Sequence, residues 1–151
     1  MALGEHSNEV LIDADIFAME WAQQIDSSLP TLLIASGVFQ YYHEEDVIRF
    51  IHAFQKTFPR GELIFDATNG KGIKYANRYV RKTGNTSAAM YFFVNDGREF
   101  ARKTGTTLLE RRTFFTDARK MPGRKLRFYT RIAMKVVDNG GRAILLHLKL
   151  N

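Results

Sequence analysis

The chain has 151 residues, of which 45% are hydrophobic and 25% charged, and its formal net charge is +6. This length and composition are typical of one globular domain with its own core. The chain has no cysteine, which excludes disulfides, thiolate catalysis and cysteine-ligated zinc. No apolar run approaches the roughly 20 residues that a membrane-spanning helix needs. The polar start lacks the pattern of a secretory signal, so we expect a cytoplasmic protein.

The charge is divided unevenly along the chain. Residues 1–48 contain nine acids and no Lys or Arg, whereas residues 49–151 contain all 22 basic residues against seven acids, a net charge of +15. Such a division occurs in nucleic-acid-binding proteins. It is also expected of a chain that works beside a larger acidic neighbour, and the sequence leaves both interpretations open.

The first third of the chain predicts two strands and two helices. Residues 10–13 (VLID) form a short apolar run that we interpret as a strand, and residues 16–25 have apolar side chains at helical spacing. Residues 31–39 (TLLIASGVF) are almost continuously apolar, as a strand buried on both faces would be. In residues 43–58, apolar side chains recur every three or four positions, which predicts an amphipathic helix.

The rest of the chain continues this alternation of strands and helices. In order, we predict a buried strand, a basic helix, an apolar aromatic run, a short helix that Asp96 caps, a strand, a long amphipathic helix and a final strand. These segments are residues 62–67, 71–82, 90–94, 96–103, 106–115, 122–138 and 142–150. Two apolar strands joined by one long helix imply a right-handed parallel crossover. The expected fold class is therefore α/β, with five strands.

Four stretches of this chain, in order and at natural spacing, resemble one known family. They are residues 31–47 (TLLIASGVFQYYHEEDV), 58–69 (FPRGELIFDATN), 71–84 (KGIKYANRYVRKTG) and 90–100 (MYFFVNDGREF). They are similar to the second half of class I S-adenosylmethionine-dependent methyltransferases of the leucine carboxyl methyltransferase and polyketide-synthesis O-methyltransferase-like branch. The likeness extends over roughly residues 10–151.

The resemblance implies a fold and an activity. Residues 1–151 would be a single domain, the C-terminal part of a methyltransferase domain with a partial Rossmann-like sheet. That sheet would be mostly parallel with an antiparallel final strand, and helices would cover both faces. The implied activity is transfer of a methyl group from S-adenosylmethionine to an oxygen of a small molecule or a carboxylate.

The chain departs from the family in two ways, and these keep other functions open. The family's glycine-rich cofactor loop and ribose-binding acid have no counterpart, since Gly70-Lys71-Gly72 is the nearest approach and follows the wrong strand. Ser36 stands where the family commonly has an acid. The alternatives are a non-catalytic remnant or partner subunit of such an enzyme, and a basic nucleic-acid-binding module.

The resemblance assigns three residues to the cofactor. Asp15, in preference to Asp13, matches the position that contacts the adenine amine, and a carboxylate suits it because it accepts a hydrogen bond. The alternative role of such an acid is to cap a helix. Ser36 and Gly37 follow a strand at the edge where α/β sheets bind ligands, although an ordinary turn would also place a serine and a glycine there.

Three further residues are candidates for binding the methyl acceptor. Tyr41 follows the Ser36 turn, where an aromatic ring would favour a sulfonium through a cation–π contact; Phe39 we assign to the core. Tyr91 and Asn95 match the part of the family that covers the acceptor, although core packing and helix capping also explain them. No catalytic residue is identified, since His43 is also expected as a surface residue at a helix start.

Two basic groups and four scattered histidines complete the list of candidates. Arg124, Arg127, Arg131 and Lys135 share one helix face, and Lys74, Arg78, Arg81 and Lys82 are interleaved with Tyr75 and Tyr79. Phosphate binding with base stacking would use such groups, but most basic helix faces are merely solvated. The histidines lack metal-ligand spacing, so we expect no metal.

The expected partners follow from the strands that the family has and this chain lacks. Without them, residues 31–39 become an apolar edge strand, which templates further pairing. Either residues 10–13 pair directly with this edge, or another chain covers it. We therefore expect a small-molecule acceptor together with a homo-oligomer, foremost a dimer, or a missing N-terminal half. We do not expect nucleic acid as the partner.

Overall fold

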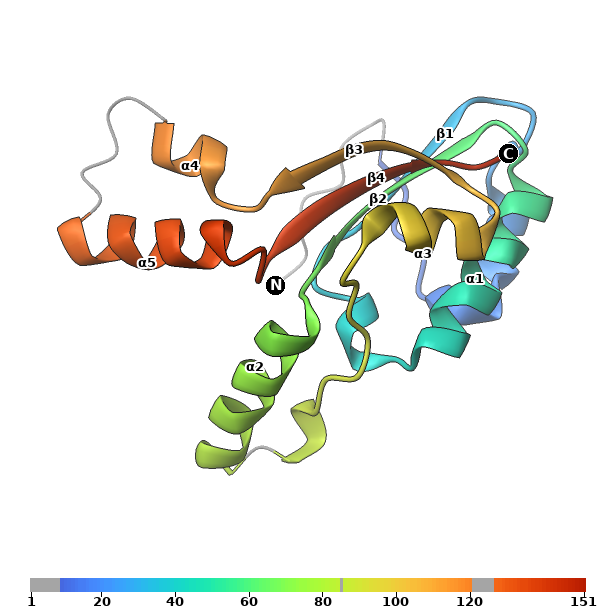
Figure 1. Cartoon of the computed structure of the whole chain (residues 1–151). Helices are drawn as coiled ribbons and strands as arrows, with labels where there is room; N and C mark the ends of the chain where they lie inside the picture. The colour runs from blue at the N-terminus through green and yellow to red at the C-terminus, as the bar shows by residue number, and fades with distance from the viewer. Residues whose placement is uncertain (1–8, 85, 121–126) are drawn as a thin grey trace.

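The computed structural model describes residues 9–84, 86–120 and 127–151 (Figure 1). Its strands are β1 (Thr31–Ala35), β2 (Gly61–Ala67), β3 (Thr107–Thr113) and β4 (Ile144–Lys149), and they form one sheet in the order β1-β2-β4-β3. β1 and β2 are parallel, and β4 is antiparallel to both β2 and β3. The final strand is therefore antiparallel, as expected. Because only one of the three pairings is parallel, the sheet is mixed.

Five α-helices and four short 3-10 helices connect these strands within the described residues. They are η1 (Ile16–Ala18), η2 (Glu20–Gln24), η3 (Phe39–Tyr41), α1 (Glu44–Thr57), α2 (Gly70–Lys82), η4 (Thr86–Ala88), α3 (Gly97–Thr104), α4 (Thr116–Lys120) and α5 (Phe128–Asn139). The α/β class predicted from the sequence is confirmed by this alternation.

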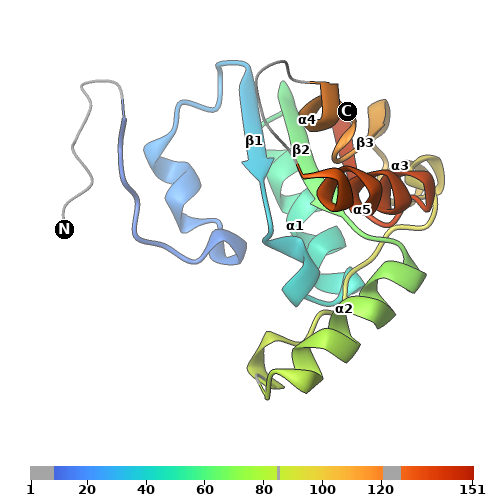
Figure 2. The same ribbon diagram turned by 90° about the vertical axis from the view of Figure 1, so that its left-hand side faces the viewer.

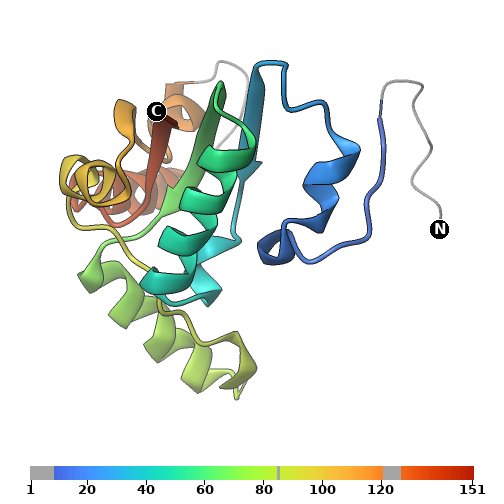
Figure 3. The ribbon, with the colours of Figure 1, turned by 90° about the vertical axis from the view of Figure 1, so that its right-hand side faces the viewer.

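The core lies between one face of the sheet and helices α1 and α3 (Figures 1 and 3). α1 forms where the apolar period predicts a helix, and three acids in its first turn complement the helix dipole. It buries Val47, Phe50, Ile51 and Phe54. Alternate residues of β2 and β4, such as Leu63 and Leu146, face this layer and are fully buried. The sheet is thus anchored on one side by a continuous apolar contact.

The opposite face of the sheet is open at β1. The side chains of Leu32 and Ile34 are 51% and 65% exposed, so the expectation of a strand buried on both faces is wrong. The strand also ends at Ala35 rather than at residue 39. α1 and α3 lie on the same face, and the expected cover of helices on both faces is not seen among the described residues. A continuous apolar run shows that a segment is rich in apolar residues. It does not show whether a layer of helices covers each face of the sheet.

The N-terminal segment differs most from the sequence prediction. Residues 10–13 form no strand, since Val10 and Leu11 are 79% and 72% exposed and have no strand partner. Direct pairing of this segment with β1 is therefore excluded in this structure. Instead of one helix over residues 16–25, two 3-10 helices are separated by Met19, which has a left-handed backbone (φ 61°). The rings of Phe17 and Trp21 nevertheless pack on Phe50 and Phe54 of α1.

Three helices surround the end of the sheet at which β1, β2 and β3 terminate (Figures 1 and 2). α2 leaves the end of β2, α4 follows β3, and α5 precedes β4. The long helix predicted over residues 122–138 begins at Phe128 in the structure, and residues 122–126 lie outside the described part. The expected apolar stripe of α5 is not packed, since Phe128, Ile132 and Val136 are 72%, 44% and 51% exposed.

In the described ranges, no helix is both long enough and apolar enough to cross a membrane.

Candidate functional site

A polar turn follows β1 at the carboxyl edge of the sheet. Ser36 and Gly37 are exposed, and Gly37 has φ 69°, a backbone conformation that favours glycine. The backbone N–H of Gly37 donates to Oδ1 of Asp66 at 2.5 Å. Asp66 lies near the end of the neighbouring parallel strand β2. The carboxylate therefore fixes the turn after β1 to the strand beside it, and the turn backbone is left accessible to a ligand.

Asp15 begins η1, and the packing of η1 brings it to the same region. The ring of Phe17 stacks on Tyr42 with centroids 4.0 Å apart and contacts Phe39 at 6.3 Å. Phe39 and Tyr42 stand shortly after the Gly37 turn in the sequence. Oδ1 of Asp15 accepts the backbone N–H of Phe17 at 2.9 Å, so Asp15 does cap a helix. Its side chain is otherwise exposed, and Asp13 is exposed too.

The candidate acceptor residues come from two adjoining segments. Tyr41 lies in η3 and is 44% exposed, and Tyr91 is 47% exposed. The backbone N–H of Tyr91 donates to the carbonyl of Gln40 at 2.8 Å, so the two segments lie side by side. The Tyr91 ring lies 4.4 Å from the exposed His43 ring. Tyr91 is thus a surface aromatic residue, whereas Phe39 is buried in the core as expected.

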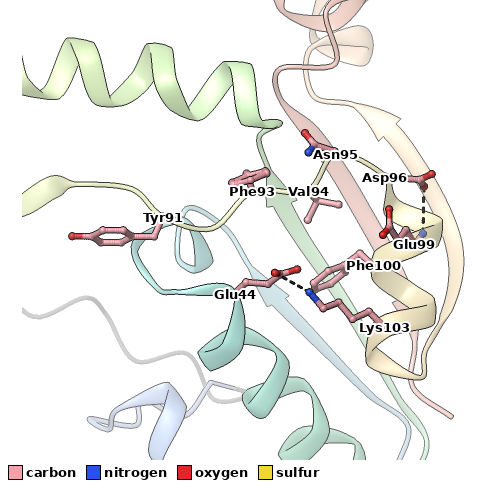
Figure 4. A pocket seen from close by; sticks show the side chains of 9 residues that line it. All are labelled: Glu44, Tyr91, Phe93, Val94, Asn95, Asp96, Glu99, Phe100 and Lys103. Carbon is pink, nitrogen blue, oxygen red and sulfur yellow. Dashed lines mark hydrogen bonds and ion pairs between the residues drawn. The ribbon is translucent and has the colours of Figure 1, made fainter.

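A pocket of about 270 Å³ opens between the first turn of α1, the segment before α3, and α3 itself (Figure 4). Its lining residues are Glu44, Tyr91, Phe93, Val94, Asn95, Asp96, Glu99, Phe100 and Lys103. It therefore contains two of the predicted acceptor residues. Tyr41, Asp15, Ser36 and Gly37 are not part of its lining, so the predicted site is divided between this pocket and the Gly37 turn.

Most polar side chains of this pocket already form ion pairs or hydrogen bonds within the protein. Nζ of Lys103 lies 2.9 Å from Oε2 of Glu44, an ion pair that joins α3 to α1 (Figure 4). The carboxylate of Asp96 caps α3 by accepting from the N–H groups of Arg98 and Glu99. Oδ1 of Asn95 accepts the N–H of Gly70 at 3.0 Å and so holds the start of α2. The pocket can accept a small polar ligand, but its residues also have clear structural roles.

No group of three or more potential ligands for a metal ion is found in the part of the chain that the structure describes.

Sequence reasoning missed Asp66 and Asn69, the two residues that organise this edge. Nδ2 of Asn69 donates to the carbonyl of Gly140 at 2.9 Å, and its Oδ1 accepts from Gly72 N at 2.8 Å. Asp66 and Asn69 stand at the end of a buried strand, which is where α/β sheets place ligand-binding residues. That position was the available signal. Their partners, however, lie 29 and 71 residues away in sequence.

Comparison with known proteins gives a structural likeness without a sequence match. No family model matches the chain, and no curated protein matches it. A crystal structure of a DUF574 family protein from Streptomyces avermitilis superposes with a TM-score of 0.60 at 11% identity, covering 93% of this chain and 54% of that one. The small RNA methyltransferase HEN1 matches with a TM-score of 0.44 at 11% identity, covering 85% of this chain and 15% of that one.

The chain therefore spans about half the length of the DUF574 protein, and at this identity the likeness concerns the fold alone. The shared arrangement is compatible with the methyltransferase fold that the sequence motifs predict. What the chain has in common with the DUF574 protein is its α/β fold.

Proposed function

We propose that this chain is the acceptor-side part of an S-adenosylmethionine-dependent O-methyltransferase. The observation that carries the proposal is the carboxyl edge of the sheet, where the exposed Ser36–Gly37 turn is fixed by Asp66. This turn stands within the first of the four family-like stretches, and Asp66 within the second. The order β1-β2-β4-β3 with a reversed β4 and the fold likeness support the same activity. The choice of oxygen as acceptor rests on the family resemblance.

The residues proposed to hold the cofactor fit its chemistry. S-adenosylmethionine supplies a methyl group on a positively charged sulfur when it is bound. The exposed carboxylate of Asp15 is suited to accept a hydrogen bond from the adenine amino group. At Gly37, no atom lies within 4 Å of the position that a Cβ would take, so a ligand can approach the backbone closely. The described residues hold no glycine-rich loop, and we therefore expect weak cofactor binding by this chain.

The acceptor would bind beside this turn, against Tyr41 and Tyr91. Both rings are partly exposed, and Tyr41 follows the Gly37 turn closely enough to offer its face to a cation. Methyl transfer requires the acceptor oxygen, the methyl carbon and the sulfur to lie in line, so orientation provides most of the acceleration. These residues would orient the reactants, and Asn95 would hold the start of α2 in place. Among the residues that the structure describes, none stands out as a base.

The cofactor assignment is tested by titrating S-adenosylhomocysteine while observing backbone amides by NMR. We expect a dissociation constant well above micromolar, which corresponds to less than about 8 kcal/mol of binding free energy. Chemical shifts should change at Asp15, Ser36 and Gly37. Asp15→Ala should weaken the binding, whereas Tyr41→Ala, on the acceptor side, should leave it unchanged.

Two outcomes would contradict these expectations, the first by overturning the function and the second by overturning only the expectation of weak binding. If millimolar S-adenosylhomocysteine moves no amide near the Gly37 turn, the chain is a non-catalytic relative that has kept only the fold. If binding is micromolar, the glycine-rich loop is not needed in the way that the resemblance implies.

A further inference from the structure

A second pocket, of about 230 Å³, lies beside the first turns of α2. It is lined by Lys71, Lys74, Tyr75, Arg78 and Arg142. The four cations come from two parts of the chain that are 64 or more residues apart in sequence. We call this group the cationic pocket. It is separate from the pocket of Figure 4, with which it shares no residue.

Specific hydrogen bonds hold the two walls of the cationic pocket together. Asn69 caps α2 through its Oδ1 and donates from Nδ2 to the carbonyl of Gly140. The hydroxyl of Thr68 donates to the carbonyl of Arg142. Gly72 allows this close approach, since a Cβ there would lie 2.9 Å from the same carbonyl. The backbone of Arg142 is therefore fixed against the start of α2.

The charge of this pocket is not neutralised by the protein. In the described residues, the side chains of Lys71, Lys74, Arg78 and Arg142 form no ion pair and no hydrogen bond, and Arg142 is bonded only through its backbone. α2 itself contains no acid. Several cations that line one small pocket repel one another, and a multiply charged anion among them relieves this repulsion. A dianion such as phosphate carries the charge that would balance these cations.

Tyr75 adds an aromatic surface to this pocket. Its side chain is 68% exposed although it stands among the cations. An exposed ring of this kind can stack on a planar group of a ligand. S-adenosylmethionine carries no phosphate, so the cofactor does not account for the charge. The pocket lies at the same end of the sheet as the Gly37 turn, because α2 starts where β2 ends (Figure 1).

We propose that the cationic pocket binds the phosphate group of a small phosphorylated molecule whose ring stacks on Tyr75. This binding goes beyond the proposed function and does not depend on it. Phosphate oxygens would accept hydrogen bonds from the lysine and arginine side chains. Such charge-assisted bonds are short and roughly twice as strong as neutral ones.

The experiment is an NMR titration of the whole chain with phenyl phosphate, and with benzoate as a singly charged probe. We expect phenyl phosphate to bind at least about tenfold more tightly than benzoate, because it carries the additional charge. Lys74→Gln/Arg78→Gln should weaken phenyl phosphate binding by about tenfold or more. The matched control is Arg81→Gln/Lys82→Gln, which removes the same charge from the same helix outside the pocket. It should change the affinity less than about twofold.

A second pair of variants tests the ring contact. Tyr75→Ala should weaken phenyl phosphate about fivefold and leave inorganic phosphate unchanged, and Tyr75→Phe should behave as the parent. If both double variants lose the same affinity for phenyl phosphate, the proposal is overturned. The overall positive charge of α2, or a nucleic-acid site along it, would then explain the binding. If Tyr75→Ala leaves the affinity for phenyl phosphate unchanged, the ring contact is overturned. S-adenosylhomocysteine binding is measured separately, so failure of either proposal leaves the other standing.

Discussion

At the scale of single residues, Asp66 has the widest influence on the candidate site. Its carboxylate joins two neighbouring parallel strands by accepting the N–H of Gly37. Without it, the exposed N–H of Gly37 would be left to water, and the left-handed turn would lose its hydrogen bond to the neighbouring strand. A hydrogen bond to a charged acceptor is worth about 1.5–3 kcal/mol. The turn that we assign to the cofactor is therefore held from the adjacent strand.

We predict that Asp66→Ala lowers the free energy of unfolding by about 1–2 kcal/mol, since Asp66 is only half-buried. Chemical denaturation measures this change. Asp66→Asn is the control, because its amide oxygen can still accept the Gly37 N–H and should recover part of the loss. The amide signal of Gly37 should move in both variants and furthest in Asp66→Ala. Equal stability of all three proteins would show that this hydrogen bond is unimportant.

The residue scale also shows what the sequence could reveal about the site. The turn at Ser36 and Gly37 could be predicted because an apolar run ends there in small residues. Tyr41 and Tyr91 lie in neighbouring segments of the structure, and their role in binding an acceptor stays a prediction. The bond from Gly37 to Asp66 could not be predicted, since it depends on which strands are neighbours. Arg142 was likewise absent from the predicted basic groups, because its place beside α2 depends on the position of β4 in the sheet.

At the scale of elements, local sequence patterns predicted where helices form better than they predicted which of their faces are buried. α1 and α3 appear close to their predicted bounds, since apolar period, first-turn acids and the Asp96 cap all agree there. η1 and η2 were expected as one helix because side-chain spacing does not reveal a left-handed residue such as Met19. The exposure of the apolar stripe of α5 was also missed. An amphipathic period predicts a helix, but it does not supply a partner for the apolar side.

The junction between α2 and β4 gives a prediction for a whole element. A Cβ on Gly72 would lie 2.0 Å from the Thr68 hydroxyl oxygen and 2.9 Å from the Arg142 carbonyl oxygen. Gly72→Ala should therefore push the start of α2 away from β4 and destabilise the fold by about 1–3 kcal/mol. It should also weaken phenyl phosphate binding, because the walls of the cationic pocket separate. Thermal unfolding and the titration described above measure the two effects.

Gly70→Ala is the matched control for this prediction. A Cβ on Gly70 meets nothing closer than a Phe93 ring carbon at 3.4 Å, an ordinary contact. Since alanine favours a helix over glycine by up to about 1 kcal/mol, this variant should be neutral or slightly stabilising. If Gly72→Ala behaves in the same way, the α2 junction tolerates more movement than the close contacts indicate.

At the scale of the whole molecule, the two edges of the sheet differ in chemistry. The β3 edge carries Glu110, Arg111 and Arg112, and its pairing with β4 is irregular between Leu108 and Glu110. Charges and bulges of this kind hinder pairing with another strand. The β1 edge has the sequence TLLIA, with no charge, and the structure shows no strand on its free side among the described residues. The edges therefore differ in their capacity to recruit another chain.

We predict that the chain associates with itself through β1, because residues 10–13 do not cover this edge. Ile34→Lys, which alters a side chain that is 65% exposed, should raise the dimer dissociation constant at least about tenfold. Sedimentation velocity measures it. The control is Leu109→Lys on the β3 edge, where the parent side chain is 47% exposed and the substitution should not change association. A stable monomer at all concentrations would rule out this pairing.

The contrast between the two edges also sets a limit on how large such an assembly can become. A sheet that is open at both ends can add strands without limit, which is the route to fibres. Here the charges and the irregular pairing of β3 hinder strand addition at one edge. Each chain therefore has a single edge, β1, at which another copy can continue the sheet. When two copies pair antiparallel through β1, neither β1 edge stays free. The charged β3 strands then form both outer edges of the combined sheet. The charged residues of β3, on the far side of the molecule from β1, would thus make association finite and keep its stoichiometry at two.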